Sequence, residues 1–407
     1  MNILIANWAW YPSGGDWTYI EAVSDLYIER GHNIIPFSMK DERNIPTEYS
    51  QYFIDNINYK ELNKQKNLNS ALNVLKKSIY STEAINNIEL LLKTEKVDLA
   101  HLNLIHHYIT PAIIKVLKKH NIPIIWTLHD YTILCPQSTF ISNDKICEKC
   151  RGGKFYQCSL NRCKKESILA SSVAAFENYV HSGLNYYKDV DFFICPSAFS
   201  YNKYKSFGFF QEKLRQIYHT YKLKDFTPNS SANTSRYIVY VGRLEKIKGV
   251  HTLLESMRHN PEIKLKVIGD GSQETELKAF KKMHSLDNVD FLGKLPKDQV
   301  LNCIQNSDFL VCPSEWYEVL GYTIYEAMLM EKPVIGSKIG AIPETVIHGE
   351  TGLLFQSGNP DDLSIMIKTL YNNADRLQMG KNARKHVESL VDKQKYLSAM
   401  QEIIPGL

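Results

Sequence analysis

The sequence has no apolar run that approaches the length of a membrane-spanning helix. It also has little excess charge, because its 407 residues carry a formal net charge of only +4, which does not by itself argue for nucleic-acid binding. Residues 1–6 form an apolar stretch without the basic region or small-residue cleavage site of a secretory leader. We therefore expect a cytoplasmic globular protein, in keeping with 44% hydrophobic and 23% charged residues.

Cysteine is scarce, with eight residues in all, and five of the eight fall within one segment. These five are Cys135, Cys147, Cys150, Cys158 and Cys163. Intracellular thiols are more often free or metal-bound than paired in disulfides. Any four of the five could form a tetrahedral zinc site, although the spacing after the Cys147–Cys150 pair is shorter than in common zinc fingers. The alternative is a loop with unligated thiols.

The same segment contains seven basic side chains: Lys145, Lys149, Arg151, Lys154, Arg162, Lys164 and Lys165. Such a run is usually a solvated face. It is also able to touch anionic lipid or a phosphorylated acceptor.

Two regions of the chain repeat the order strand, glycine turn, helix. The first has an apolar strand at 2–6, a turn with Gly14 and Gly15, and an amphipathic helix at about 16–30. The second has a strand at 237–241 and a helix at 250–257. This order is typical of parallel βαβ units in doubly wound sheets.

A stretch rich in Ser, Asn and Pro at 227–236 separates the two regions and is the best linker in the sequence. We therefore predict an α/β protein with two Rossmann-like domains, 1–220 and 221–384. The cysteine-rich segment, about 135–165, is an insertion in the first domain. The last residues, 385–407, are expected to form a helix that packs back on the first domain.

Both glycine turns suit an anionic ligand. Gly14 and Gly15 let the backbone approach a ligand at a helix N-terminus, where free N–H groups favour an anion, although a tight turn without a ligand is equally compatible. Arg243 and Lys248 lie in the second turn, where two cations could grip a diphosphate or be solvated. His129 falls at the C-terminal end of a predicted strand, the edge where open α/β sheets bind ligands.

Two acidic residues follow a short apolar strand at 309–312. Glu326 lies in the middle of a helix expected from about 320 to 331, which is apolar almost all round and should be buried. A buried carboxylate needs donors, and a ligand rich in hydroxyls could supply them. Glu318 lies in the preceding loop and is expected to be exposed.

With these motifs in place, the chain resembles a retaining glycosyltransferase of family 4, with the two-Rossmann-domain architecture called GT-B. The most specific match is Glu318-x7-Glu326 within Pro-Ser-x3-Glu-x2-Gly-x4-Glu-Ala-Met. Gly-Arg-Leu-x3-Lys-Gly around Arg243 and Lys248 matches almost as well. The Gly14–Gly15 pair and Leu-His-Asp at 128–130 match the N-terminal half, so the resemblance covers nearly the whole chain.

The resemblance implies a nucleotide-sugar donor, a UDP- or GDP-sugar, and no catalytic metal. It implies that Glu326 binds the ribose and Glu318 a hydroxyl of the transferred sugar. Arg243 and Lys248 would hold the diphosphate and lower the barrier to its departure. The resemblance also gives backbone groups a role in donor binding at Gly14, Gly15, Val319, Leu320 and Gly321. His129 would orient or polarise the sugar near its 6-position.

The cysteine segment resembles a subset of these enzymes with Leu-His-Asp-Tyr-x3-Cys-Pro, then Cys-x2-Cys-x-Gly-Gly, then a later Cys. By that pattern the ligands of a structural zinc would be Cys135, Cys147, Cys150 and Cys163, with Cys158 as the alternate. The sequence departs from the family after Glu318, where Val-Leu-Gly replaces the usual Gly-Phe-Gly or Pro-Phe-Gly, and at His219-Thr-Tyr, where Asn-Gly is common.

We expect the acceptor to be a glycan or lipid-linked glycan used in surface polysaccharide biosynthesis, with peripheral contact to an anionic membrane and no nucleic-acid partner. One alternative is a GT-B epimerase acting on a nucleotide sugar. A second is glycoside hydrolysis by paired carboxylates, although the two acids lie in a nucleotide-binding setting. A third is a non-enzymatic, zinc-containing protein that binds nucleic acid. That alternative leaves two Rossmann-like halves unexplained, and the basic segment lacks the interleaved aromatics that would stack on bases.

Overall fold

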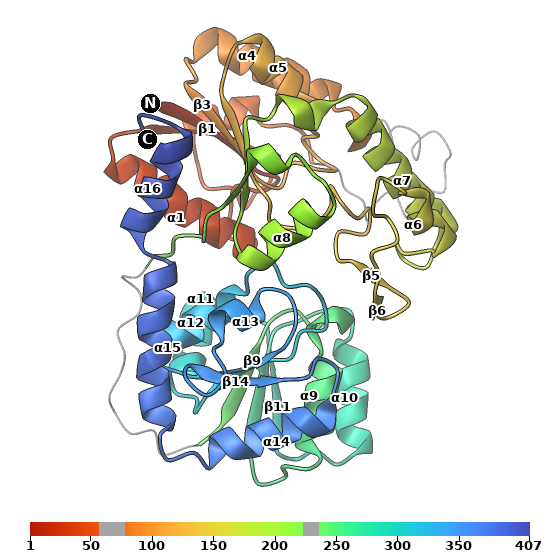
Figure 1. Ribbon diagram of the computed structural model, residues 1–407, viewed down its shortest axis with the longest axis vertical. Coiled ribbons are helices and arrows are strands. Elements are labelled where there is room, and N and C mark those ends of the chain that lie inside the picture. The colour runs from red at the N-terminus through yellow and green to blue at the C-terminus, as the bar shows by residue number, and fades with distance from the viewer. Residues whose placement is uncertain (57–77, 223–235) are drawn as a thin grey trace. The chain divides into compact units, whose positions relative to one another are not determined.

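The computed structural model describes residues 1–56, 78–222 and 236–407 (Figure 1). The chain divides into two compact units. The first comprises Met1–Tyr221 together with Lys393–Leu407, and the second comprises Lys222–Asp392. Except for Arg236, the linker predicted at 227–236 lies outside the described residues.

The first unit is built on a parallel sheet. Its described strands, in spatial order, are β2 (Asn33–Phe37), β1 (Asn2–Ala6), β3 (Leu99–Leu102), β4 (Ile124–Thr127), β7 (Phe192–Cys195) and β8 (Leu214–Gln216). Strands such as β1 are apolar along their length because helices cover both faces of a parallel sheet. The direction of strand addition reverses between β1 and β3, and doubly wound folds bind ligands at the carboxyl ends of the strands on either side of such a reversal.

The described helices of the first unit are α1 (Gly15–Glu29), α4 (Thr82–Thr94), α5 (Ile113–Lys119), α6 (Tyr156–Leu160), α7 (Ile168–Gly183), α8 (Ala198–Ser206) and α16 (Lys393–Ile403). A short hairpin, β5 (Ile141–Ser142) and β6 (Lys145–Ile146), leads into α6. The last helix, α16, lies against α1: the hydroxyls of Tyr396 and Tyr19 are 2.6 Å apart, and Lys393 pairs with Glu29.

The second unit repeats the architecture with another parallel sheet. Its described strands, in spatial order, are β11 (Val289–Gly293), β10 (Leu265–Ile268), β9 (Ile238–Val241), β12 (Leu310–Cys312), β13 (Val334–Ser337) and β14 (Gly352–Phe355). Here the order reverses between β9 and β12. Two Rossmann-like α/β domains are therefore present, as the strand and helix order predicted.

The described helices of the second unit are α9 (Val250–Met257), α10 (Glu274–Met283), α11 (Lys297–Gln305), α12 (Tyr322–Leu329), α13 (Ile342–Thr345), α14 (Pro360–Tyr371) and α15 (Arg376–Leu390). The boundary expected after residue 384 falls inside α15. That helix stays with the second unit because it packs on α12, where Arg384 donates to the carbonyl of Leu329. The chain rejoins the first unit only at Lys393. None of the helices in the described ranges combines the length and the apolar character needed to cross a membrane.

Candidate functional site

The motif residues of the second unit meet at the carboxyl ends of β9 and β12, on either side of the reversal in strand order. The loop after β9 carries Arg243 and Lys248, and the loop after β12 carries Glu318. The two loops are in direct contact, because the backbone N–H of Glu315 donates to the carbonyl of Ile247 at 2.8 Å. The fold therefore brings together residues that are about 70 positions apart in the sequence.

A buried ion pair joins these loops. The ammonium of Lys248 donates to Oε1 of Glu318 at 2.6 Å, and the hydroxyl of Ser314 donates to the same oxygen at 2.6 Å. Only 19% of the Lys248 side chain and 7% of the Glu318 side chain are exposed. Lys248 also lies over the ring of Trp316. A low-dielectric surrounding strengthens such an interaction and makes the loss of either partner costly.

The protonation state of Glu318 follows from these contacts. Burial by itself would raise its pKa, but the charge of Lys248 and the hydrogen bonds from Lys248 and Ser314 outweigh burial, so the pKa is lowered. Glu318 is therefore a carboxylate at neutral pH. The expectation that it would be the exposed acid is wrong, since Gly340 and Ala341 pack directly against its backbone and Ala341 donates to its carbonyl at 2.9 Å.

Glu326 lies inside α12 and is 3% exposed, as its apolar surroundings in the sequence predicted. Its carboxylate accepts from the ammonium of Lys297 on α11, a side chain that is 55% exposed. The hydrogen-bond donor to Glu326 is thus a lysine from a neighbouring helix, whereas the sequence had led us to expect a hydroxyl-rich ligand in this role. Because the Lys297 side chain is largely exposed, a ligand could reach this acid by displacing its ammonium.

The remaining donor-site candidates of the second unit lie in the same two loops and at the start of α12. The Arg243 side chain is exposed, whereas Val319 and Leu320 are buried. Gly321 is the N-cap of α12 with φ of 96°, a left-handed conformation that glycine adopts without strain. The N-terminal end of a helix presents backbone N–H groups toward the preceding loop, and such a terminus favours an anion.

In the first unit, Gly14 is the N-cap of α1 with φ of 150°, and Gly15 is the first helical residue. The carboxylate of Asp16 lies beside this turn, accepting from Nε1 of Trp8 at 2.9 Å and from Asn7 at 3.2 Å. Asn7 directly follows β1, so the turn is anchored at the end of the strand beside the sheet reversal. Asp16 is therefore a site candidate that the sequence pattern did not single out.

His129 follows β4 and is held in one tautomer. Its Nε2 lies 2.9 Å from Oδ1 of Asn103, while Nδ2 of the same asparagine donates to the carbonyl of His101. A carbonyl oxygen only accepts, so Nε2 carries the proton and Nδ1 is left as an acceptor. Burial lowers the pKa of His129 to about 4, with the charge of Asp16 acting in the opposite direction. The imidazole is therefore neutral at physiological pH.

A buried aromatic network backs His129. The ring of Tyr19 lies 5.3 Å from that of His129 and stacks on His219 with a centroid distance of 3.9 Å. The Tyr19 hydroxyl lies within hydrogen-bond distance of Thr127, His101 and Tyr396. His219, one of the departures from the family resemblance, thus lies in the network that positions the candidate catalytic histidine.

Two further histidines of the first unit, His106 and His107, have different surroundings. His106 is buried against Trp126, and His107 forms an ion pair with Glu177 of α7.

The cysteine segment folds as a small cluster on α7. Cys150 and Cys158 are buried with Phe155 and Ala175, and Cys163 packs against them. The Cys158 thiol donates to Cys163, and this hydrogen bond is the main cause of a lowered pKa at Cys163. Within residues 1–56, 78–222 and 236–407, no three His, Cys, Asp or Glu side chains are grouped so that they could hold a metal ion. The structure therefore gives the predicted zinc set no direct support.

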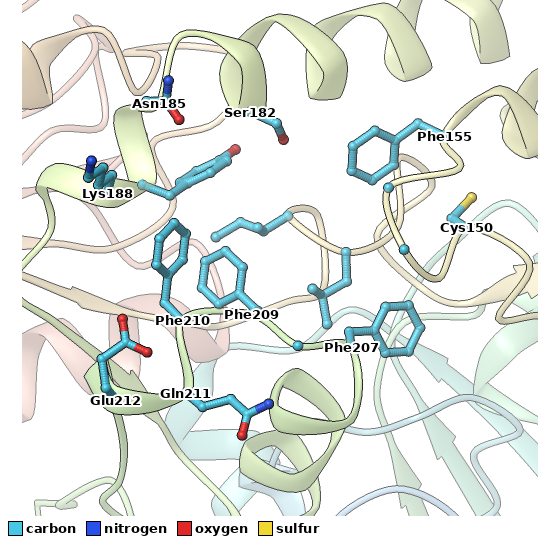
Figure 2. Close-up of a pocket in the computed structure, with 16 residues that line it drawn as sticks. Cys150, Phe155, Ser182, Asn185, Lys188, Phe207, Phe209, Phe210, Gln211 and Glu212 are labelled. Atoms are coloured by element: carbon cyan, nitrogen blue, oxygen red, sulfur yellow. The ribbon is translucent and has the colours of Figure 1, made fainter.

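A cavity in the first unit borders the cysteine cluster, and Cys150 and Phe155 are among its lining residues. It measures about 670 Å³ and is lined by aromatic side chains from the segment after α8 and by the start of α6. Figure 2 shows Phe155, Phe207, Phe209 and Phe210 around it. None of the donor-site candidates lines it.

Sequence reasoning missed several residues that support the site. Ser314 and Lys297 hydrogen-bond the two acids, and Asp16, Asn103 and Tyr19 surround His129. The sequence could have identified Ser314, because this residue belongs to the Pro-Ser-x3-Glu pattern. The others have no local signal, since each acts on a residue far away in the chain.

The fold and the site define a GT-B glycosyltransferase architecture, with two Rossmann-like units and paired acids beside cations at the carboxyl ends of the second sheet. The family models agree. Residues 13–224 match the model described as Glycosyltransferase Family 4, and residues 222–386 match Glycosyl transferases group 1. The chain belongs to Glycosyltransferase Family 4.

Among curated proteins, the uncharacterized glycosyltransferase MJ1178 of Methanocaldococcus jannaschii is 33% identical over 36% of this chain and 41% of its own length. The N-acetyl-alpha-D-glucosaminyl L-malate synthase of Bacillus anthracis is 29% identical over 42% of this chain and 46% of its own. The matched region thus spans less than half the length of these relatives.

Solved structures match over the whole chain. The Anabaena protein Alr3699/HepE in complex with UDP and glucose has a TM-score of 0.69 at 19% identity, with 100% of both chains covered. The sucrose-phosphate synthase of Thermosynechococcus elongatus has a TM-score of 0.73 at 20% identity, covering 99% of this chain and 98% of its own. At these identities the likeness is one of fold.

Proposed function

We propose that the protein is a retaining glycosyltransferase that moves a sugar from a UDP- or GDP-sugar to a glycan or lipid-linked glycan. The observation that carries the proposal is the set of acids and cations at the β9 and β12 strand ends. Glu318 and Glu326 are both buried, yet each is paired with a lysine. Core packing does not require these buried, paired acids, or the exposed Arg243 in the loop that also carries Lys248.

The donor fits this surface by its chemistry. A nucleoside diphosphate carries negative charge at the diphosphate and neutral hydroxyls on ribose and sugar. Lys248 and Arg243 supply cations from one loop, and the N-terminus of α12 supplies N–H groups from the next. Glu326 would accept from the ribose hydroxyls and Glu318 from a hydroxyl of the transferred sugar. A structural relative, Alr3699/HepE, has been solved in complex with UDP-glucose, and a donor of this class is consistent with that complex.

The proposed reaction is a front-face substitution at the anomeric carbon. The bond between that carbon and the β-phosphate oxygen breaks, and a bond to the acceptor oxygen forms on the same face. The departing phosphate takes the acceptor's proton, so the protein needs no side-chain nucleophile. Its task is to stabilise the charge that grows on the leaving diphosphate, which fixed cations do most effectively. His129, neutral and with Nδ1 as an acceptor, would orient the sugar.

The acceptor proposal rests on the family resemblance and on the basic cysteine segment. A growing, lipid-linked surface glycan would bring the enzyme to the cytoplasmic face of an anionic membrane. The basic side chains of the cysteine segment would then meet the anionic headgroups.

Donor binding tests the proposal directly. Thermal-shift measurements across UDP-, GDP-, ADP- and dTDP-sugars should single out one nucleotide, because binding to the native state raises its apparent stability. Transfer and donor hydrolysis should both fall on the order of a hundredfold in Arg243→Ala and Glu326→Ala. If both variants keep the wild-type transfer rate and melting temperature, the assignment of the donor site is wrong. Donor turnover to an epimer without transfer would instead favour the epimerase alternative.

A further inference from the structure

Helix α7 (Ile168–Gly183) presents an apolar face to solvent. Leu169 is 76% exposed and Phe176 is 54% exposed. Val173 and Val180 are partly exposed at intervening turns, which gives the spacing i, i+4, i+7 and i+11 along one side of the helix. The opposite side carries the buried residues, Ala174 and Ala175 among them. A helix at the surface of a globular protein normally turns polar residues to water, so this face is unusual.

The apolar face continues onto the neighbouring elements. Sixteen large hydrophobic side chains in the described ranges are exposed, and eight of them lie between Ile146 and Leu184. Helix α6 packs on α7, where the Tyr179 hydroxyl accepts from the backbone of Tyr156 (Figure 1). The exposed apolar residues are therefore gathered on α6, α7 and the adjoining β5–β6 hairpin rather than scattered, and gathered apolar surface marks an interaction site.

The same elements concentrate positive charge. Residues 144–166 contain seven Lys and Arg against three Asp and Glu, a balance of +4. The whole chain also has a formal net charge of +4, so the rest of the sequence is balanced. Lys145, Lys154, Arg162 and Lys165 are exposed. The cavity of Figure 2 adjoins this region through Phe155 at the start of α6 and Ser182 on α7, and Arg151 lies over its Phe207 ring.

An anionic lipid surface matches both properties together. Interfacial helices bury an apolar face among acyl chains while neighbouring Lys and Arg side chains meet anionic headgroups. A second copy of the chain fits less well, because a symmetric contact would set two surfaces of the same positive charge against each other. We propose that the surface formed by residues 144–166 and the outward face of α7 docks the protein on an anionic phospholipid bilayer. Only the biological role of this docking rests on the proposed function, because docking would bring the enzyme to a lipid-linked acceptor.

Vesicle flotation tests the docking surface with the full-length protein. We expect binding to phosphatidylglycerol vesicles at low salt, at least tenfold weaker binding to phosphatidylcholine vesicles, and loss of binding at high salt because exposed charges are screened. The double variant Leu169→Asp/Phe176→Asp should reduce binding at least tenfold, and so should Lys154→Glu/Lys165→Glu. Leu377→Asp is the matched control: Leu377 is 75% exposed but lies in the second unit, and this change should leave binding intact.

Three outcomes would overturn the proposal. These are absence of binding to anionic vesicles at low salt, equal binding to neutral vesicles, and equal loss of binding in the Leu377→Asp control. A concentration-dependent dimer abolished by Leu169→Asp/Phe176→Asp, without vesicle binding, would show that a second copy covers the face instead. Nucleotide thermal shifts on the same variants separate the two proposals, since donor binding should persist in all of them. Every substituted side chain is exposed, so unchanged circular dichroism and melting temperature should verify folding.

Discussion

At the scale of single residues, the site depends on how Glu318 is kept ionised away from water. Its pKa is lowered because Lys248 and Ser314 offset the cost of burial. A folded-state pKa below the unfolded value means that this carboxylate stabilises the native state above about pH 4.5. The contribution is lost as the pH falls through the lower folded-state pKa.

Removing the Lys248 ammonium should show how far stability depends on the ion pair with Glu318. In Lys248→Ala the carboxylate of Glu318 remains buried without its ion pair, and we expect a loss of roughly 1–3 kcal/mol of unfolding free energy at pH 7. The loss should shrink near pH 4, where the variant neutralises Glu318 by taking up a proton. Urea unfolding at both pH values measures the effect. Lys246→Ala, at an exposed position in the same turn, is the control; an equal loss there would contradict the ion-pair explanation.

His129 should behave as a neutral group throughout the physiological range. Its pKa of about 4 lies below the unfolded value of 6.5, so protonation of the unfolded chain should erode stability as the pH falls from about 6.5 to 4. Between about pH 5.5 and 8 we expect no titration step from His129 in the rate profile. His129→Gln should lower kcat on the order of a hundredfold because the oriented imidazole is lost. A rate step near pH 6.5 that disappears in this variant would refute a neutral role.

At the scale of elements, the close approach of the β9 and β12 loops sets the geometry of the site. Gly249 has φ of 68°, and a Cβ atom there would lie 1.9 Å from the carbonyl oxygen of Pro313. Only glycine allows both the left-handed turn and this contact. The glycine thus places Lys248 where it reaches Glu318.

Alanine substitutions at two glycines distinguish the cost of left-handed backbone strain from the cost of a steric clash between the two loops. Gly293 also has φ of 68°, but a Cβ atom there would meet nothing within 4 Å. Gly293→Ala should therefore cost only the strain of the left-handed backbone, about 1 kcal/mol. Gly249→Ala should cost measurably more and should also abolish the UDP thermal shift, because the two loops must separate. Equal costs with nucleotide binding retained in both variants would mean that the loop contact is unimportant.

The cysteine segment makes a second prediction at this scale, and its ligand set rests on the family resemblance. Protein purified without chelators should contain about one zinc per chain if four thiolates form a structural site. Zinc should be lost in Cys163→Ser and kept in Cys158→Ser if Cys135, Cys147, Cys150 and Cys163 are the ligands. Elemental analysis of both variants distinguishes the two candidate sets. A trace of zinc well below one per chain in the wild type would exclude the site.

At the scale of the whole molecule, the sequence predicted what is local or repeated. The order strand, glycine turn, helix occurs twice, and this repeat was enough to predict two Rossmann-like domains. It also placed Arg243, Lys248 and the two acids after the ends of predicted strands. The burial of Glu318 was not predictable, because it depends on the later loop at Gly340. The same holds for the contact of Lys297 with Glu326 and for the joining of Tyr19 to Tyr396, which lies 377 residues further along the chain.

Hydrogen exchange provides a readout over the whole chain of where a nucleotide binds. UDP or the nucleotide selected by thermal shift should slow amide exchange in the loops at 242–249 and 313–321 and in the first turn of α12. The reason is that bound phosphates take up the N–H groups of that turn and stabilise the local native state. The strands of both sheets are already buried and should change little. Segment 144–166 serves as an internal control, because the lipid-docking surface contains none of the proposed donor contacts. Protection confined to 144–166, or spread evenly over the chain, would move the nucleotide site away from the β9 and β12 strand ends.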